Sequence, residues 1–296
     1  MAKNISGFTF IKNGLTLGYP ILESVQSIDP LCDEVVINVG FDDPNLQKDD
    51  GTYEYLRDHL NNDKYIFVKS YWDPQMTSKG LILSQQTNIA LEKCQGKYCQ
   101  YIQGDEALHE QDYSLVENGI RGMEGNQSIE GLVYKYLHFY GNVDAILYTQ
   151  RIYRREVRLI RNGLGTKSFL DAQGFKTADG KKLSCKEIEA PVYHYGWARK
   201  EQVMAKKVIA MDKLYKGPEF EKKQKFVYHK MWGIKPFMGT HPEVMAKWIE
   251  AHRNEIDILS LPMAFRLKDM RLVISDFIES LTGYRIGEYK NFNLID

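Results

Sequence analysis

The sequence predicts an α/β protein in which helices flank a mostly parallel sheet, followed by a helical carboxy-terminal extension. Strand-type and helix-type segments alternate four times in the first third of the chain, the pattern of a parallel sheet with helices on both faces. Residues 33–40 are apolar on both faces, as a buried parallel strand requires. Helical patterns return near the end, at residues 242–252 and 267–281.

The first third of the chain supplies the clearest elements. Residues 5–11 form an apolar, β-prone run that ends at the turn signal Lys12-Asn13-Gly14. Pro20 opens a helix whose apolar residues recur at helical spacing up to residue 28. The remaining predicted elements of this part are strand 33–40, helix 54–60, strand 65–68, helix 81–94 and strand 98–102.

The pattern is looser after residue 110. Residues 119–126 are rich in glycine and predict a loop, while 129–140 mix helix and strand signals. We expect a β-hairpin from 151–153 and 157–160, a short strand at 192–195 and a helix at 202–215. The predicted organisation is one domain over 1–215, with halves at about 1–110 and 111–215, and an extension over 216–296.

Composition excludes some classes of function. Lys plus Arg and Asp plus Glu both number 39, so the net charge is zero, and nucleic-acid binders are usually basic. The four cysteines lack the spacing of a metal site and predict reduced thiols in a cytoplasmic protein. We expect no signal peptide and no membrane span, because long apolar runs are absent from the sequence. The sequence leaves two further possibilities open, a peripheral contact with a membrane and the formation of a homodimer.

The most informative stretch follows the strand at 98–102, which ends in Gln103-Gly104-Asp105-Glu106. Ligands of open α/β sheets bind at the carboxyl ends of the strands. Two carboxylates there suit Mg²⁺ or Mn²⁺, which are held by one or two carboxylates with substrate phosphates completing the shell. The alternative is a polar turn, and the preceding β-α units favour the metal interpretation.

These residues resemble a known family. GFTFIKNG at 7–14, the helix opened by Pro20 and DEVVINVGFDD at 33–43 look like the opening of family 2 glycosyltransferases of the GT-A fold. The resemblance covers about the first 110 residues well and the next hundred more loosely, and it rests on the order and spacing of motifs. It implies an inverting, metal-dependent hexosyltransferase. Such an enzyme moves a sugar from a nucleoside diphosphate sugar, a UDP-sugar by preference, to a glycan or other hydroxyl acceptor, as in polysaccharide biosynthesis.

The resemblance also implies metal ligands. Asp105 stands at the second aspartate of the family's DxD-type motif and is the first-choice ligand, while Gln103 stands at the first and would line the nucleotide site. Glu106 is a weaker ligand candidate. His194, in a patch that continues through Gly196 and Trp197, would complete the site, and its imidazole suits Mn²⁺ better than Mg²⁺. The alternative for His194 is a hydrogen-bonded core histidine.

Further residues map onto the nucleotide and the diphosphate. Asn38 stands where the family has a uracil-contacting aspartate, and Asn88 belongs to the counterpart of its Arg-Asn pair. The remaining candidates are Lys12 and Asn13 for the nucleotide pocket, Asp42 or Asp43 for the ribose, and Arg199 and Lys200 for the diphosphate. For the two aspartates, a turn residue whose carboxylate accepts hydrogen bonds from its own backbone is about as good an explanation. For Arg199 and Lys200, a solvent-exposed pair at the start of a helix is nearly as good.

The acceptor hydroxyl needs a general base, commonly a carboxylate. Related members place an acid shortly after the segment at 157–159, and Asp171 occupies that place here. Glu124 and Glu130 are alternatives, and Asp171 could also be a simple loop carboxylate.

Two other functions compete. A sugar-phosphate nucleotidyltransferase has a similar sheet but carries a glycine-rich basic loop after the first strand, which residues 11–15 do not provide. A non-catalytic nucleotide-sugar-binding scaffold is favoured by the departures at Gln103, Asn38 and Thr87 from the family pattern. Donor hydrolysis that depends on Asp105 would separate the scaffold from the enzyme.

Overall fold

A computed structural model describes residues 4–220, 225–263 and 265–295. Within them, one mixed sheet of eleven strands has the main order β12-β7-β6-β8-β4-β1-β2-β3, with β11, β5 and β13 paired beside that path. The strands are β1 Ile5–Ile11, β2 Glu34–Phe41, β3 Tyr65–Tyr71, β4 Tyr98–Tyr101, β5 Glu106–Leu108, β6 Gly131–Tyr140, β7 Asn142–Leu147, β8 Arg155–Arg161, β11 Leu183–Trp197, β12 Ile234–Pro236 and β13 Phe292–Leu294. The predicted α/β class is confirmed.

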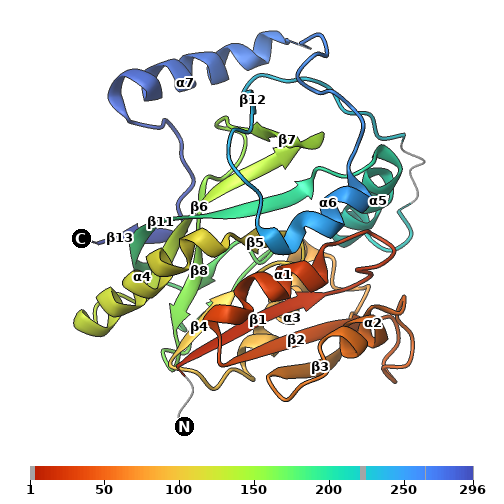
Figure 1. The fold of residues 1–296 in the computed structure, drawn as a ribbon, viewed down its shortest axis with the longest axis vertical. Coiled ribbons are helices and arrows are strands. Elements are labelled where there is room, and N and C mark those ends of the chain that lie inside the picture. The colour runs from red at the N-terminus through yellow and green to blue at the C-terminus, as the bar shows by residue number, and fades with distance from the viewer. Residues whose placement is uncertain (1–3, 221–224, 264, 296) are drawn as a thin grey trace.

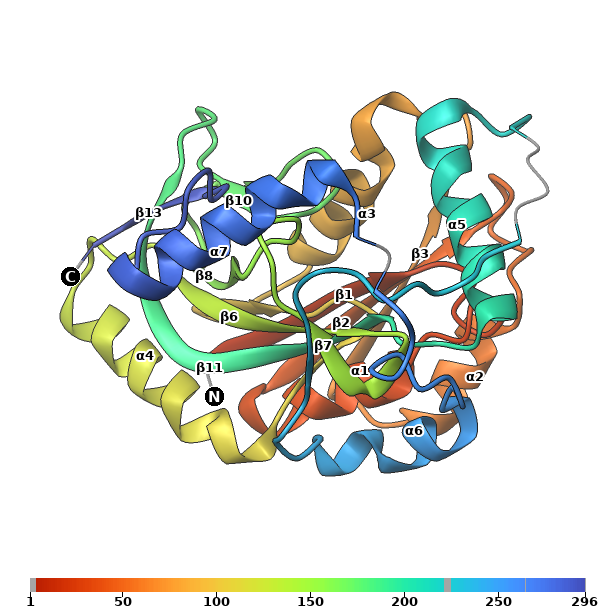
Figure 2. The same cartoon turned by 90° about the horizontal axis from the view of Figure 1, so that it is seen from above.

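The first half of the sheet is parallel. β1 pairs with β2 and β4, and β2 pairs with β3, all in parallel. Helix α1 (Ile21–Ile28) buries Ile21, Val25 and Ile28, a stripe with helical spacing. Figure 2 shows α1 on one face of these strands and α3 (Leu81–Leu91) on the other, while α2 (Thr52–His59) lies near β3. The alternation of strands and helices predicted in the first third is therefore confirmed.

The second half is mostly antiparallel and corrects one prediction. β8 pairs with β4 on one side and with β6 on the other, and β6 also pairs with β7. The predicted hairpin of 151–153 with 157–160 is wrong, because residues 151–153 form no strand and β6 lies between β7 and β8. The short strand predicted at 192–195 is part of the long β11, which runs parallel to β6.

The glycine-rich segment at 119–126 is helical up to residue 125, so the predicted loop is also wrong. It belongs to α4 (Tyr113–Gly125), whose Val116, Ile120 and Met123 are buried at helical spacing. A Cβ on Gly119 would lie 2.6 Å from a Leu132 methyl group. Gly119 therefore lets the helix approach β6 closely, and this packing outweighs the low helix propensity of glycine.

The carboxy-terminal extension contains the two expected helices, α6 (Ala246–His252) and α7 (Met270–Thr282). It also returns to the sheet, since β12 pairs with β7 and β13 pairs with the start of β11. In Figure 1, α6 lies near α1, whereas α7 stands at the opposite end of the molecule from β1–β3. No helix in the described ranges is long and apolar enough to cross a membrane. Helix α5 (Glu201–Lys216) precedes the extension.

Candidate functional site

Strand pairing brings the acidic motif and the histidine patch together. β5 begins at Glu106 and pairs antiparallel with β11, which places Glu106 opposite His194. The Tyr195 amide donates to the Asp105 carbonyl at 2.8 Å. Two segments that are far apart in the sequence therefore meet at the carboxyl end of β4.

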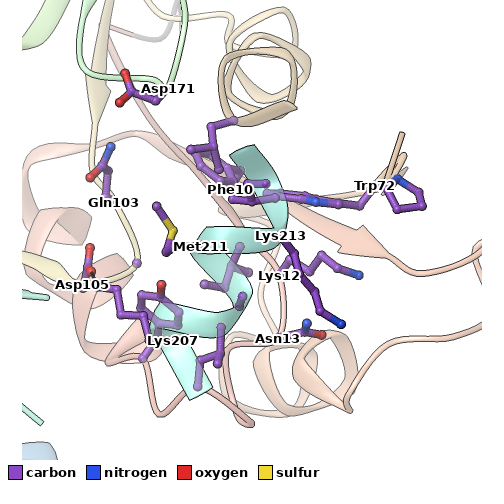
Figure 3. A pocket seen from close by; sticks show the side chains of 18 of the residues that line it. Phe10, Lys12, Asn13, Trp72, Gln103, Asp105, Asp171, Lys207, Met211 and Lys213 are labelled. Atoms are coloured by element: carbon purple, nitrogen blue, oxygen red, sulfur yellow. Dashed lines mark hydrogen bonds and ion pairs between the residues drawn. The ribbon is translucent and has the colours of Figure 1, made fainter. Parts of the chain in front are cut away.

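A cavity of about 450 Å³ opens at this edge of the sheet, a size typical of small-molecule sites. In Figure 3, Asp105 and Lys207 lie toward one end of the cavity, Trp72 lies toward the other, and α5 runs between them. The wall is largely apolar and aromatic, formed by Phe10, Ile11, Leu17, Tyr19, Trp72, Pro74, Leu83, Trp197, Ala210, Met211, Leu214 and Pro218.

Asp105 is a buried carboxylate surrounded by nitrogen atoms. Its Oδ2 accepts from Lys207 Nζ at 2.9 Å and from Arg199 Nη2 at 3.3 Å. Its Oδ1 lies 3.7 Å from His194 Nε2. Burial alone would raise the pKa of Asp105, but Lys207, His194 and Arg199 outweigh it and hold the pKa well below its usual value. Asp105 is therefore ionised throughout the neutral range.

Glu106 cannot act as the predicted metal ligand in this geometry. Its side chain is fully buried, and its two oxygens accept from Arg158 at 2.8 and 3.0 Å. The Tyr136 hydroxyl and the Gln103 amide donate to the same carboxylate at 2.7 and 3.0 Å. With both oxygens engaged, Glu106 forms a structural ion pair behind the cavity, and the prediction is corrected.

A chain of hydrogen bonds orients His194. His138 Nε2 lies 2.7 Å from the Tyr153 carbonyl, which can only accept, so Nε2 carries the proton. Burial and the charge of His194 lower the pKa of His138 well below its usual value, so His138 is neutral and its Nδ1 accepts. His194 Nδ1 lies 2.8 Å from that atom and must donate. His194 Nε2 then faces Asp105, with a proton when the imidazole is charged and with a lone pair when it is neutral, as inferred from this network.

The atoms facing each other at this point fit a cation. The Asp105 Oδ1 and the His194 Nε2 lone pair are both acceptors, so a proton or a metal ion between them would relieve their repulsion. A Cβ on Gly196 would lie 2.6 Å from His194 Nε2 and 2.9 Å from Asp105 Oδ2, so this glycine keeps the space beside both groups open. In the described part of the chain, no three His, Cys, Asp or Glu side chains converge as metal ligands.

The structure separates the other predicted residues into two sets. Those that line the cavity, together with Asp105 and His194, are Lys12, Asn13, Gln103 and Asp171. Those outside its wall, together with Glu106, are Asn38, Asp42, Asp43, Asn88, Arg199 and Lys200.

Asn38 and Asn88 have structural partners instead of a nucleotide. The buried Asn38 amide donates to the Gln86 carbonyl at 2.9 Å and to Gln86 Oε1 at 3.0 Å, and it accepts from Ser70 at 2.7 Å. Asn88 is hydrogen-bonded to both backbone groups of Ser168, at 2.8 and 3.1 Å. Because these amides are already engaged outside the cavity, the two predictions are corrected.

Asp42, Asp43 and Lys200 also lie outside the cavity wall. Asp42 is paired with Lys12, and Asp43 accepts from three backbone amides of its own turn, as the turn alternative predicts. Lys200 is exposed, and its Nζ lies 3.4 Å from the Ala251 carbonyl. Arg199 is fully buried behind the wall and contacts Asp105 instead of facing the cavity. None of these four residues lines the cavity.

Asp171 lies at the cavity edge in the loop between β9 (Lys167–Ser168) and β10 (Phe175–Lys176). The view in Figure 3 places Gln103 between Asp171 and Asp105. The alternative bases are elsewhere. Glu124 of α4 pairs with Lys97, and Glu130 accepts from the Ser184 amide at 2.7 Å.

Sequence reasoning missed the contribution of α5. Lys207, Met211 and Lys213 of this helix line the cavity, although the helix itself was predicted. One signal was present: Lys207 follows Met204 by three residues and precedes Met211 by four, so it falls on the apolar side of the helix. A lysine on that side indicates a buried charge with a partner elsewhere.

No family model matches the sequence, and no curated protein matches it. Among solved structures, the chain is similar to residues 1–349 of TarS from S. aureus in complex with UDP, with 12% identity, a TM-score of 0.38 and coverage of 94% of this chain and 81% of that one. It is also similar to the mannosyltransferase PcManGT from Pyrobaculum calidifontis in complex with GDP-Man and Mn²⁺, with 15% identity and a TM-score of 0.31. That match covers 45% of this chain and 35% of that chain.

A third similar structure is glucosyl-3-phosphoglycerate synthase from Mycobacterium tuberculosis in complex with Mn²⁺, UDP and phosphoglyceric acid. The identity is 17%, the TM-score is 0.30, and the match covers 47% of this chain and 43% of that one. At these scores the similarities do not assign a function to this chain.

Proposed function

We propose that the protein is a glycosyltransferase of the GT-A type that moves a sugar from a nucleoside diphosphate sugar to a hydroxyl acceptor. The observation that carries the proposal is the cavity at the carboxyl end of β4, where the ionised Asp105 and the oriented His194 line one wall. The donor half, about 1–110, would bind the nucleotide, and the acceptor would enter from the half at about 111–215.

The shape of the cavity supports this class of ligand. Phe10 and Trp72 line the end of the cavity away from Asp105, with ring centroids 6.1 Å apart. Aromatic faces of this kind suit a nucleobase. Lys12 and Asn13 lie nearby and offer polar contacts to the nucleotide. The diphosphate would then extend toward Lys207 and Asp105, where positive charge is concentrated.

Asp105 Oδ1 and His194 Nε2 are the atoms that would hold a divalent cation, with diphosphate oxygens and water as its other ligands. A cation bound there would stabilise the negative charge that develops on the leaving diphosphate. The imidazole donor favours Mn²⁺ over Mg²⁺. His138 would contribute by fixing the tautomer of His194, as outer groups commonly do for metal-binding histidines.

Asp171 is the proposed base of an inverting reaction. The acceptor oxygen attacks the anomeric carbon on the side opposite the diphosphate, the bond to the diphosphate oxygen breaks, and Asp171 accepts the hydroxyl proton. Burial raises the pKa of Asp171, which makes its carboxylate a stronger base. The loop around it has left-handed backbone at Leu170 and Ala172, with φ of 50° and 60°, and such strain is common at functional sites.

A non-catalytic nucleotide-sugar-binding scaffold is the second candidate. One observation favours it: the carboxylate that would hold the metal already accepts from Lys207 and Arg199. A scaffold would bind the donor but would neither transfer nor hydrolyse the sugar.

The test is calorimetric titration of UDP and of GDP, with and without Mn²⁺, into wild type, Asp105→Asn and Asp144→Asn. Asp144 is the matched control, because it is half-exposed and pairs with Arg253 outside the cavity wall. We expect Mn²⁺ to strengthen binding of one nucleotide in wild type and the control, and this gain to fall at least about tenfold in Asp105→Asn.

The titration also names the donor base, and hydrolysis of the corresponding nucleotide sugar then separates the enzyme from the scaffold. If neither nucleotide binds under any condition, the donor site is misplaced. If the nucleotide binds but the donor sugar is neither transferred nor hydrolysed, the scaffold is the better description. Turnover that persists in Asp105→Asn would instead remove Asp105 from the proposed mechanism.

A further inference from the structure

Lys207 is an unusual lysine, because its charge is buried at the cavity wall. Only 7% of the residue is exposed. Its ammonium donates to Asp105 Oδ2 and to the Gly196 carbonyl, both at 2.9 Å. An ammonium has three N–H groups, and these two acceptors are the hydrogen-bond partners found in the described chain. The third N–H faces a wall that includes the rings of Tyr19 and Trp197, whose centres lie 5.3 and 5.9 Å away, and it can donate to a ligand that enters the cavity. Figure 3 shows Lys207 beside Asp105.

Arg199 adds a second buried charge at the same carboxylate. It is fully buried, donates to the Leu17 carbonyl at 2.6 Å and contacts Asp105 at 3.3 Å. Its guanidinium carbon lies 4.2 Å from the centre of the Tyr19 ring. Within the described residues, its Nε has no hydrogen-bond partner. The backbone and ring contacts fix this group in place, so it cannot move away from Asp105 without losing them.

The charges at this point do not balance. One carboxylate, Asp105, faces the cationic side chains of both Arg199 and Lys207, so one of the two cations has no carboxylate of its own there. Burying an uncompensated charge is costly, and an anion in the cavity would offset that cost. Of the other charged residues that line the cavity, Lys213 is exposed, Lys12 is paired with Asp42, and Asp171 lies at the far side from Asp105.

We propose that Lys207, supported by Arg199, is a built-in cation for the donor diphosphate, so that nucleotide binding persists when divalent metal is removed. The inference rests on the proposed function, because it assigns the ligand as a nucleoside diphosphate. Lys207 contacts a phosphate oxygen through its third N–H, while Arg199 keeps Asp105 neutralised. A divalent ion at Asp105 Oδ1 and His194 then adds to this binding and is not a condition for it.

The experiment is calorimetric titration of UDP and of GDP in excess EDTA into wild type, Lys207→Met and Lys206→Met. Lys206 is the matched control: it is the adjacent lysine of α5, but it is exposed and does not line the cavity. We expect wild type and Lys206→Met to bind one nucleotide in EDTA. Lys207→Met should bind it about 10- to 100-fold more weakly, as expected for loss of a hydrogen bond to a charged group.

The outcomes distinguish this inference from the proposed function. If a nucleotide binds only when Mn²⁺ is present, the role of Lys207 is overturned and the donor site stands. If nothing binds even with Mn²⁺, both fail. Equal affinity of Lys207→Met and wild type in EDTA also overturns the inference. Thermal unfolding of each variant checks the fold. If Lys207→Met does not fold, Lys207→Arg takes its place and should retain binding in EDTA that Lys207→Gln loses, while the wild-type titration in EDTA by itself tests whether metal is required.

Discussion

A carboxylate serves as a general base when it is ionised, positioned and basic enough, and the surroundings of Asp171, the proposed base, bear on the last of these requirements. Its Oδ2 accepts from Gln173 at 3.2 Å and from the Tyr215 hydroxyl at 3.3 Å. Burial raises its pKa, and those two hydrogen bonds only partly offset the rise. Tyr215 belongs to α5, so the same helix that carries Lys207 also positions the proposed base.

The pH dependence of the transfer rate follows from this shift. Protonated Asp171 cannot accept a proton, so the rate should fall as pH drops through a pKa above the ordinary aspartate value of about 3.9. Asp171→Asn should lower the rate about 10²- to 10⁴-fold while nucleotide affinity is retained. Transfer rates of wild type and Asp171→Asn, measured as a function of pH, give the pH dependence and the loss of rate. Asp179→Asn, at an exposed position, is the control. A loss smaller than tenfold would place the base elsewhere.

At the scale of elements, a buried ion pair and a hydrogen bond to it connect three strands. Glu106 of β5 and Arg158 of β8 are both at most 1% exposed, and Tyr136 of β6 donates to the same carboxylate. Arg158 also donates to the Gln173 carbonyl at 3.2 Å, close to the Asp171 loop. The pair therefore ties the end of the acidic motif to the loop that carries the proposed base.

Breaking this pair should cost stability. Glu106→Gln keeps the shape but leaves the Arg158 charge without its partner, and we expect the free energy of unfolding to fall by about 3–5 kcal/mol. Glu124→Gln, which breaks an exposed pair with Lys97, should cost at most about 1 kcal/mol. Urea unfolding measures both. A cost as small as the control's, together with loss of Mn²⁺ binding, would restore Glu106 as a metal ligand.

At the scale of the whole molecule, the carboxy-terminal segment is attached to the sheet. β13 runs parallel to the start of β11, and Phe292 packs with Phe175, Leu183 and Cys185 in one buried cluster. Arg155 of β8 pairs with Glu288 at 2.5 Å just before β13. The carboxy-terminal strand β13 is therefore held to the sheet by pairing with β11, by the buried Phe292 and by the ion pair of Arg155 with Glu288.

Two phenylalanines of the extension test this attachment. Phe292 is 3% exposed, whereas Phe277 of α7 is 62% exposed. Phe292→Ala should lower the free energy of unfolding by about 3–5 kcal/mol, and Phe277→Ala by less than about 0.5 kcal/mol. Chemical denaturation followed by circular dichroism compares them. Similar, small losses for both would mean that the extension does not share the core of the sheet.

Local patterns were sufficient for the parts of the fold that depend on neighbours in the chain. The alternation of apolar strands and amphipathic helices predicts β1 to β4 and the helices between them, because burial against one sheet imposes those periods. A second general rule, that ligands of open α/β sheets bind at the carboxyl ends of the strands, directed attention to Asp105 just after β4. After residue 110, the secondary-structure prediction was wrong where packing outweighed local propensity. Gly119, which lies in α4 and not in the predicted loop, is an example.

Tertiary structure alone decided which charged groups face the cavity. Asp105 and Glu106 are adjacent and alike in the sequence, yet Arg158 engages Glu106 while Asp105 stays at the wall. Lys207 reaches Asp105 from a helix far along the chain, and no local pattern encodes that meeting. A pairwise contact of charges depends on the packing of whole elements, whereas periodicity depends only on the residues within one element.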